Sequence, residues 1–183
     1  GRILEKVGQK GQDTCELFFD GAHVAPDNVL GGVEGKGFAQ LMTELPYERT
    51  ILGVAGVAAI ERALALTVEY TRERKAFGQT LFDMQNTRFV LAEIKTEATI
   101  ARIFIDRCIE DMISGRMDTV QASMAKYWIS DLQCKVIDQC VQLFGGYGYM
   151  LEYPIAQMYV DARVQRIYGG ANEIMKEIIA RSL

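Results

Sequence analysis

A charged pair follows a proline and precedes a long apolar run in the stretch LPYERTILGVAGVAAI. Glu48 and Arg49 are neighbours here, just after Pro46. A carboxylate at the edge of an apolar region is desolvated, which raises its pKa toward the range of a useful general base. A surface ion pair at a proline kink explains the same residues, so both interpretations remain open.

Two other stretches have the composition of a phosphate or nucleotide site. YTRERKAFGQ has Arg72, Arg74 and Lys75 at the end of an expected helix. Phe77 follows them, which suits a phosphate clamp beside a stacking ring. The glycine-rich LFGGYGYM, residues 143–150, follows a helix rather than a strand and is therefore not a dinucleotide fingerprint. Charge at a helix C-terminus and a C-cap turn explain both stretches without a ligand.

Composition excludes several classes of function. The chain has 183 residues, a net charge of -4 and a pI near 5.1, which gives no support for nucleic-acid binding. The longest apolar run, residues 51–60, is shorter than the roughly 20 residues of a membrane span. His23 is the only histidine and reads as a loop residue, so triads and most zinc chemistry are disfavoured. The four cysteines have no CxxC spacing and read as buried apolar residues in a reducing compartment.

The elements that position these stretches differ before and after residue 35, because the spacing of apolar residues changes there from strand-like to helical. Residues 1–31 alternate apolar and polar side chains between turn residues, which predicts strands. Two or three strands do not make a stable sheet alone, and no initiator methionine is present, so we expect a segment of a longer protein. The rest has helical periodicity, beginning with a helix from Lys36 to Arg74 that Pro46 should kink or split.

The later helices are predicted from apolar stripes with spacings of three and four. The first stripe consists of Leu91, Ile94, Ala98, Ala101, Ile105, Cys108 and Met112. The second consists of Ala122, Ala125, Ile129, Leu132, Val136 and Cys140. Gly115 should end one helix, and Asp118 or Thr119 should cap the next. Two more helical stretches follow, and such helices with short connections pack as an antiparallel bundle.

The sequence resembles the acyl-CoA dehydrogenase family over essentially its whole length. The resemblance is carried, in the family's order, by DTCELFFDGAHVAPDNVLG, GKGFAQLM, ERKAFGQ and QLFGGYGYMLEYPIAQMYVDARVQRIYGGANEI, and it is strongest for the long-chain branch. It implies a mainly α fold: an antiparallel four-helix bundle, residues 35–183, after a short β segment, residues 1–31, left from a middle β domain. It also implies FAD and the oxidation of an acyl-CoA to a trans-2-enoyl-CoA, as in fatty acid β-oxidation.

The resemblance also implies which carboxylate is the base. Most branches carry the glutamate in YEG immediately before the last helix, where this sequence has Gly169. The long-chain and isovaleryl branches carry it on the kinked first helix of the bundle, at the position of Glu48. A base on the first helix approaches the substrate from the opposite side of the pocket, so it requires that position 169 carry no large side chain. Gly169 meets this requirement. Arg49 resembles the arginine beside the acyl-CoA, and Pro46 and Tyr47 line the same wall.

Two groups of residues resemble the family's FAD contacts. The first group lies across a subunit interface from its FAD and corresponds to Arg74, Phe77, Gln142, Leu143, Phe144, Gly145 and Gly146, and Gln85 resembles a further FAD contact. The second group lies at the flavin, where Gly170 allows close approach and Asn172 and Glu173 begin a helix with free N–H groups. Many relatives have threonine where Ala171 stands, so a flavin hydrogen bond from that hydroxyl is lost or replaced.

The resemblance implies partners and compartment as well. We expect an acyl-CoA substrate, an electron-transfer flavoprotein as electron acceptor, and a homodimer or homotetramer without a membrane span. The location would be the bacterial cytoplasm or the mitochondrial matrix, not the secreted fraction. Two alternatives remain: an acyl-CoA oxidase that passes electrons to oxygen, or, for this chain alone, a non-catalytic helical assembly module. Chain length and branching of the acyl group are not fixed by these residues.

Overall fold

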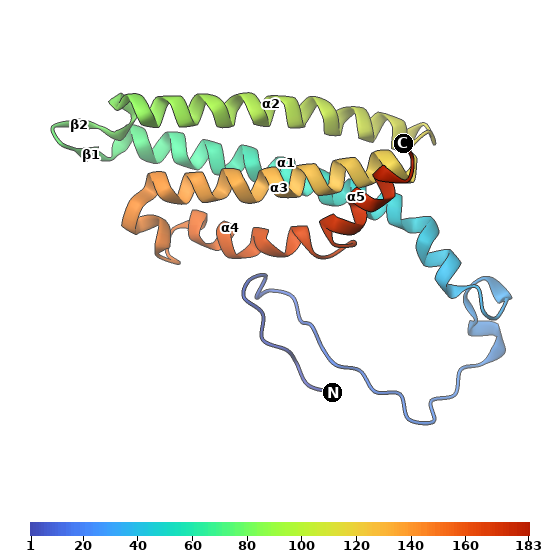
Figure 1. Ribbon diagram of the computed structural model, residues 1–183. Coiled ribbons are helices and arrows are strands. Elements are labelled where there is room, and N and C mark those ends of the chain that lie inside the picture. Colours follow the sequence, from blue (N-terminus) through green and yellow to red (C-terminus); the bar gives the residue numbers. More distant parts are fainter.

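The computed structural model describes all 183 residues and is mainly helical (Figure 1). The helices are α1 (Gly37–Glu73), α2 (Gln85–Ile113), α3 (Thr119–Phe144), α4 (Pro154–Ala162) and α5 (Asn172–Ala180). One antiparallel hairpin, β1 (Lys75–Ala76) with β2 (Gln79–Thr80), connects α1 to α2. Short 3-10 turns lie at Pro26–Asn28, Leu30–Gly32, Leu81–Asp83, Gly145–Tyr149 and Arg163–Arg166.

The long helices form the predicted antiparallel bundle. Helices α1, α2 and α3 alternate in direction, and α4 lies alongside them (Figure 1). Helix α3 is central, because it packs against α1, α2, α4 and α5. The four-helix fold class is therefore confirmed, with α5 as a short additional helix that crosses α3.

The apolar stripes predicted from the sequence form the core. Every residue of the α3 stripe is buried, and so is every residue of the α2 stripe up to Cys108. Met112 is only half-buried, and Asp111 beside it is the buried residue instead. Replacing a fully buried isoleucine such as Ile129 with alanine in a core of this kind costs about 2–5 kcal/mol.

Helix α1 approaches α2 and α3 closely because it carries glycines where it faces them, Gly53 toward Ile105 of α2 and Gly56 toward Ile129 of α3. A Cβ atom on Gly53 would lie 2.8 Å from Ile105 Cδ1, and one on Gly56 would lie 2.7 Å from Ile129 Cγ2. Both distances are too short for two carbon atoms, so larger residues would force the helices apart. The small residues in ILGVAGVAAI thus serve packing within the bundle.

Pro46 does not split the first helix, because α1 is continuous from Gly37 to Glu73. The proline removes one backbone donor. Thr50, one turn later, donates from Oγ1 to the Pro46 carbonyl at 2.8 Å. Figure 1 shows the first turns of α1 diverging from the bundle axis, so the other prediction for this proline, a bend, agrees with the structure.

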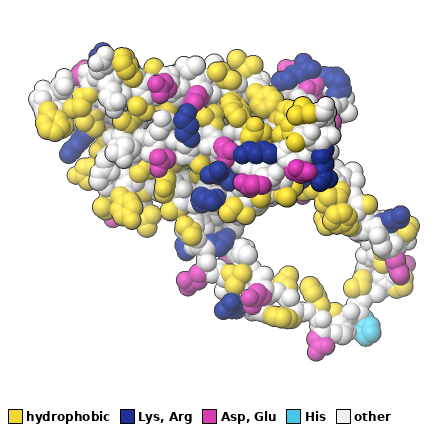
Figure 2. Space-filling view, viewed as in Figure 1, with side chains coloured by type: hydrophobic (Ala, Val, Ile, Leu, Met, Phe, Trp, Pro, Cys, Tyr) yellow, Lys and Arg dark blue, Asp and Glu magenta, His cyan; other side chains and the backbone are white.

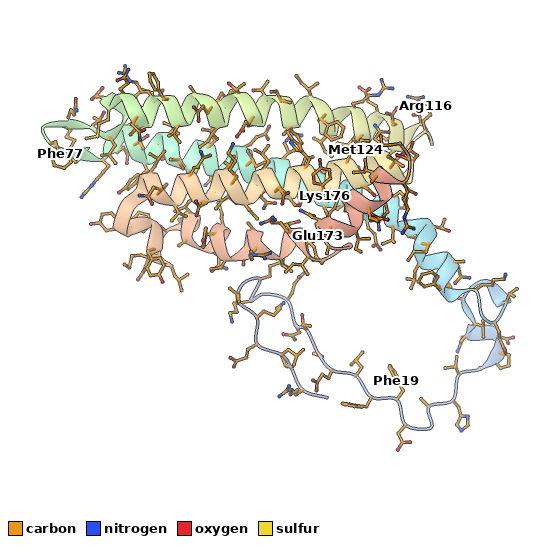
Figure 3. All side chains as sticks on the ribbon, viewed as in Figure 1. Phe19, Phe77, Arg116, Met124, Glu173 and Lys176 are labelled. Atoms are coloured by element: carbon orange, nitrogen blue, oxygen red, sulfur yellow. The ribbon has the colours of Figure 1, made fainter.

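The strands expected in residues 1–31 do not form here. Ile3 and Cys15 make one isolated antiparallel bridge, and the two strands of the chain lie in the later hairpin. The segment forms an arm that leaves the bundle at α1 and contacts it again where the Gln9 N–H donates to Asp161 of α4. The arm carries exposed apolar side chains (Figure 2), and Phe19 is one of them (Figure 3). Extended segments without further strands to complete a sheet have little to stabilise them. Cys15 is consequently exposed, contrary to the expectation that all the cysteines are buried. His23 lies in this exposed arm, as predicted.

Helix α1 is long and apolar enough, by length and composition alone, to cross a membrane. The uninterrupted apolar run of residues 51–60 is shorter than the apolar part of α1, because further apolar residues lie on both sides of it. The criterion is weak evidence, since the core helix of a soluble protein also meets it. Val57, Ile60 and Ala63 of this helix are fully buried in the shared core, so the bundle accounts for part of its apolar surface.

A buried carboxylate organises the connection between α2 and α3. Gly115, with φ of +70°, ends α2 and Asp118 caps α3 by accepting from the Gln121 N–H, as predicted. Asp111 accepts hydrogen bonds from Gln121, Arg107 and Arg116 at 2.9–3.2 Å. These bonds, that of Gln121 first, lower the pKa of Asp111 to about 2.

We expect Asp111→Asn to lower the thermal midpoint of the chain at neutral pH. The native pKa lies below the unfolded value of about 3.9, so this stabilisation is present above pH 4 and is lost as the pH falls toward 2. Thermal melts at decreasing pH should therefore show the parent and the variant converging between about pH 4 and pH 2. Asp106→Asn is the control, because that carboxylate also bonds an arginine but is exposed. A difference that persists unchanged at pH 2 would contradict the assignment.

Candidate functional site

The two adjacent glycines form a turn that only glycine fits. Gly169 has φ of +67° and Gly170 has φ of +100°, a region that side chains disfavour. A Cβ atom on Gly169 would lie 2.6 Å from Leu52 Cδ1, and one on Gly170 would lie 2.7 Å from Met175 Cε. The backbone conformation therefore favours glycine at the entry to α5, and an added methyl group would also displace the ends of the Leu52 and Met175 side chains.

Two buried cations hold this turn from beneath. Arg49 on α1 donates from Nε to the Gly169 carbonyl at 3.1 Å. Lys126 on α3 donates from Nζ to the Gly170 carbonyl at 2.7 Å and to Asn172 Oδ1 at 2.7 Å. Arg49 is 5% exposed and Lys126 is 1% exposed. Burial lowers the pKa of the Arg49 guanidinium, and it lowers the pKa of Lys126 to about 8.

Asn172 links α5 to the central helix. Its amide nitrogen donates to Ser130 Oγ and Asp131 Oδ1, each at 3.0 Å, and to the Tyr127 carbonyl at 3.2 Å. Its oxygen accepts from Lys126, and the whole side chain is buried. Both polar atoms of the Asn172 side chain are therefore satisfied, which fixes where α5 begins relative to α3.

The backbone of the turn presents unused donors. The N–H groups from Gly169 to Glu173 form no hydrogen bond within the chain. Ala171 is the N-cap residue of α5 and has no side-chain capping bond. Consecutive free N–H groups at a helix N-terminus favour an anionic or electron-rich partner. Glu173, in the first turn, is exposed.

Glu48 lies on the same wall as Arg49 but faces outward. It is exposed, and it lines an open groove of about 740 Å³ formed by the first turns of α1 and the preceding loop, residues 29–37. Tyr47 is also exposed and Pro46 is half-buried. The desolvation of Glu48 expected from the sequence is absent in this structure, because its side chain is exposed in the groove. The Arg49 to Gly169 bond nevertheless brings this wall to the glycine turn.

A second pocket brings together two segments that are distant in sequence. It has a volume of about 650 Å³ and is lined by Tyr70, Arg74, Leu81, Gln142, Leu143, Phe144, Gly145, Gly146, Tyr147 and Met150. The Arg74 guanidinium lies 5.4 Å from the centre of the Tyr147 ring. No atom lies within 4 Å of a Cβ built on Gly145 or Gly146, so the backbone is open on this side.

Three of the residues expected to contact FAD differ from the others in their position or exposure. Phe77 is 95% exposed at the tip of the hairpin with φ of +53°, and Gln85 is exposed in the first turn of α2, both outside the pocket. Phe144 lines the pocket but its ring is buried, stacked 4.1 Å from the ring of Tyr70. Its ring is therefore part of the core.

The two groups of candidate residues lie apart on the bundle. Figure 3 shows Phe77 at one end and Glu173 near the other. On α3, Ser130 bonds Asn172 and Phe144 lines the second pocket; these residues are roughly 21 Å apart at 1.5 Å per residue.

Lys126 was not identified as a candidate from the sequence, although its position carries a signal. It follows Ala125 and lies four residues after Ala122 and three before Ile129, which places a lysine on the apolar stripe of α3. A lysine is almost never fully buried unless its charge has partners. Such a residue within a core stripe is therefore itself a candidate for a functional site.

Gly169→Ala is expected to destabilise the fold by about 1–2 kcal/mol through its left-handed conformation alone. The added methyl group also meets Leu52, so the measured cost should exceed that range. Urea unfolding of Gly169→Ala in the parent and in a Leu52→Ala background measures the two parts.

Gly115→Ala is the matched control, because Gly115 has a similar φ and open space around its Cβ position. Its cost should be the same in both backgrounds. If Leu52→Ala left the cost of Gly169→Ala unchanged, the proposed contact with Leu52 would be wrong.

Comparison with known protein families and with known proteins gives matches to one family. Residues 35–183 match the family model described as the acyl-CoA dehydrogenase, C-terminal domain. The chain is 52% identical to the mouse mitochondrial long-chain specific acyl-CoA dehydrogenase over all 183 residues, which is 42% of that protein's length.

Solved structures are similar over the whole chain. An acyl-CoA dehydrogenase from Geobacillus kaustophilus is 47% identical with a TM-score of 0.96, and the match covers 100% of this chain and 48% of that one. A structure described as the electron transferring flavoprotein of Acidaminococcus fermentans is 33% identical with a TM-score of 0.94, and the match covers 100% and 48% of the two chains.

Proposed function

The chain belongs to the acyl-CoA dehydrogenase family, and we propose that it is the C-terminal part of an enzyme that converts an acyl-CoA to a trans-2-enoyl-CoA. In this proposal residues 1–31 end a middle β domain and residues 35–183 are the helical bundle domain. The observation that carries it is the hydrogen bond from Arg49 to the Gly169 carbonyl. This bond connects the part of α1 that carries Glu48 to Gly169, the position at which most relatives have their catalytic base.

Glu48 is the proposed base for the α-proton of the substrate. The usual position is Gly169, and the space beside it is filled by Leu52 from α1. A carboxylate on α1 then reaches the substrate from the opposite wall, where Pro46 and Tyr47 flank it. Glu48 is exposed in this chain, so its desolvation would come from bound substrate and from segments outside residues 1–183.

The backbone at the turn supplies the complementary electrostatics. An acyl-CoA α-proton becomes removable only when negative charge on the thioester oxygen is stabilised. The Gly169 N–H is free to donate to that oxygen, and this role does not depend on a side chain. Changing glutamate to glycine at this position therefore removes the base but keeps the donor.

FAD is the proposed cofactor, and when bound it supplies the acceptor for the hydride from the β-carbon. The residues fit such a group in two places. At the second pocket, Arg74 offers a cation for a pyrophosphate and the bare backbone of Gly145 and Gly146 allows close approach. At the turn, Gly170 and the start of α5 offer free N–H groups. The distance between the places fits the inference that one chain contributes to two FAD sites in a homodimer or homotetramer.

We further propose an electron-transfer flavoprotein as acceptor. The similarity to a structure described by that name supports this choice. The mouse relative is mitochondrial and the Geobacillus relative is bacterial, which supports the mitochondrial matrix or the bacterial cytoplasm as the location. As an isolated segment the chain is expected to be inactive and to associate through its exposed apolar side chains, such as Phe38, Leu41 and Phe89.

Glu48→Gln in the whole enzyme should retain FAD and lose enoyl-CoA formation by several orders of magnitude, because the amide does not accept the α-proton. Single-turnover reduction of the flavin by an acyl-CoA measures this step. Glu44→Gln is the matched control, since Glu44 lies one turn earlier on α1 and lines the same groove. Near-normal turnover in Glu48→Gln would refute the assignment of the base.

Arg74→Ala in the whole enzyme should lower the FAD content of the purified protein, because a charge-assisted contact to phosphate is removed. Flavin absorbance per protein measures the bound fraction. Arg72→Ala is the control: Arg72 lies over the Phe82 ring at 5.0 Å, outside the pocket. Equal FAD content in the two variants would argue against the second pocket as part of the cofactor site.

A further inference from the structure

Arg49 and Lys126 are buried cations without a contacting carboxylate. No carboxylate oxygen lies within 4.0 Å of either side chain, although eight such pairs occur elsewhere in the chain. Their direct partners are neutral: the carbonyls of Gly169 and Gly170 and the amide oxygen of Asn172. Buried charges in folded proteins are usually paired, so this arrangement needs an explanation.

The carbonyl contacts determine where the neighbouring N–H groups point. In a trans peptide, the carbonyl of one residue and the N–H of the next point in opposite directions, and the chain contains no cis peptide. Arg49 holds the Gly169 carbonyl, so the Gly170 N–H points away from Arg49. Lys126 holds the Gly170 carbonyl, so the Ala171 N–H points away from Lys126. Neither N–H has an acceptor within the chain.

Lys126 contacts both the turn and the first residue of α5. One ammonium group bonds both the Gly170 carbonyl and Asn172, the first residue of α5. It thereby fixes the last peptide of the turn and the first residue of the helix together. A bond to Asn172 alone would anchor the helix, whereas the bond to Gly170 orients the donor of Ala171.

The positive charge of Lys126 and the free N–H groups of the turn both favour negative charge on a nearby ligand. Asp131 on α3 and Glu173 on α5 favour its charged form, while Arg49 on α1 and Arg166 disfavour it. No direct ion pair neutralises the ammonium group, so positive potential remains beneath the free N–H groups. Charge held in a low-dielectric interior acts on a nearby ligand more strongly than the same charge in water.

We propose that Lys126 is a positioning residue of the acyl-CoA and flavin site: it holds the Gly170 carbonyl and Asn172 so that the backbone donors of the turn face the ligand, and its charge stabilises negative charge that develops there. This inference rests on the proposed function. It also gives a role to Ala171, whose backbone N–H supplies a donor where many relatives carry a threonine hydroxyl.

Lys126→Gln in the whole enzyme should lower kcat about 10- to 100-fold with little change in KM, somewhat less than the loss of a direct oxyanion donor. It should also shift the reduction potential of the bound flavin to a more negative value, because the reduced flavin gains negative charge. Lys135→Gln is the control, since Lys135 lies on the same helix but pairs with Glu97 at the surface. Lys126→Arg, which keeps the charge, should restore part of both quantities.

The pH profile supplies a second readout. Lys126 loses its charge as the pH rises through about 8, so kcat of the parent should fall in that range. In Lys126→Arg the fall should move to higher pH, because a guanidinium stays protonated. This comparison tests the proposal even if Lys126→Gln does not fold.

Three outcomes would overturn the inference. The first is an unchanged kcat and flavin potential in Lys126→Gln. The second is a loss of folded protein or FAD with normal turnover per bound FAD, which would make Lys126 structural only. The third is an identical pH profile in the parent and Lys126→Arg. A parent enzyme that neither binds FAD nor oxidises an acyl-CoA would instead refute the proposed function, and the inference with it.

Discussion

The buried polar junction between α1, α3 and α5 is the constraint on which the rest of the candidate site depends. The Asn172 side chain has both polar atoms bonded, to Lys126 and to residues 127–131, so the start of α5 has one position on α3. Arg49 ties α1 to the same place through Gly169. A partly satisfied network of this kind would be costly in an apolar interior, whereas a fully bonded one favours a single arrangement.

The glycine turn follows from this junction. Its two carbonyls accept hydrogen bonds from cations on different helices, and both residues have positive φ. Only glycine adopts such a conformation readily. The space that a side chain at Gly169 would occupy is taken by Leu52 from α1. The conformation and the packing thus both favour a base located elsewhere, and Glu48, four residues before Leu52, is on the helix that fills that space.

The helices were predictable because their apolar stripes are regular. The stripe of α3 is buried throughout, and Asp118 and Gly115 act as the caps that their types indicate. The strands in residues 1–31 were not predictable from alternation, since a strand depends on neighbours that this chain does not provide. The burial of Asp111 instead of Met112 was not predictable for a related reason. Periodicity identifies the buried face of α2, but the hydrogen bonds of Asp111 with Arg107 and Arg116 decide which residue is buried at the end of that face.

The candidate site was predictable only in part, for a similar reason. Family motifs brought together Arg74 and residues 142–146, which do share a pocket. They did not identify Lys126, because its proposed role depends on contacts to the Gly170 carbonyl and the Asn172 side chain, 44 and 46 residues away, rather than on a local pattern. They also did not predict that Glu48 is exposed, because desolvation is a property of everything that surrounds a side chain and not of its neighbours in sequence.

In the proposed function the base and the backbone donors belong to different elements of the fold. A carboxylate at position 169 would combine the base and the N–H donor in one residue. With glycine at that position the donor remains on the turn, held through Arg49 and Lys126, while the proposed base belongs to α1. The base can then change place without disturbing the donors, because carbonyl contacts that are independent of any side chain on the turn fix the direction of its peptides.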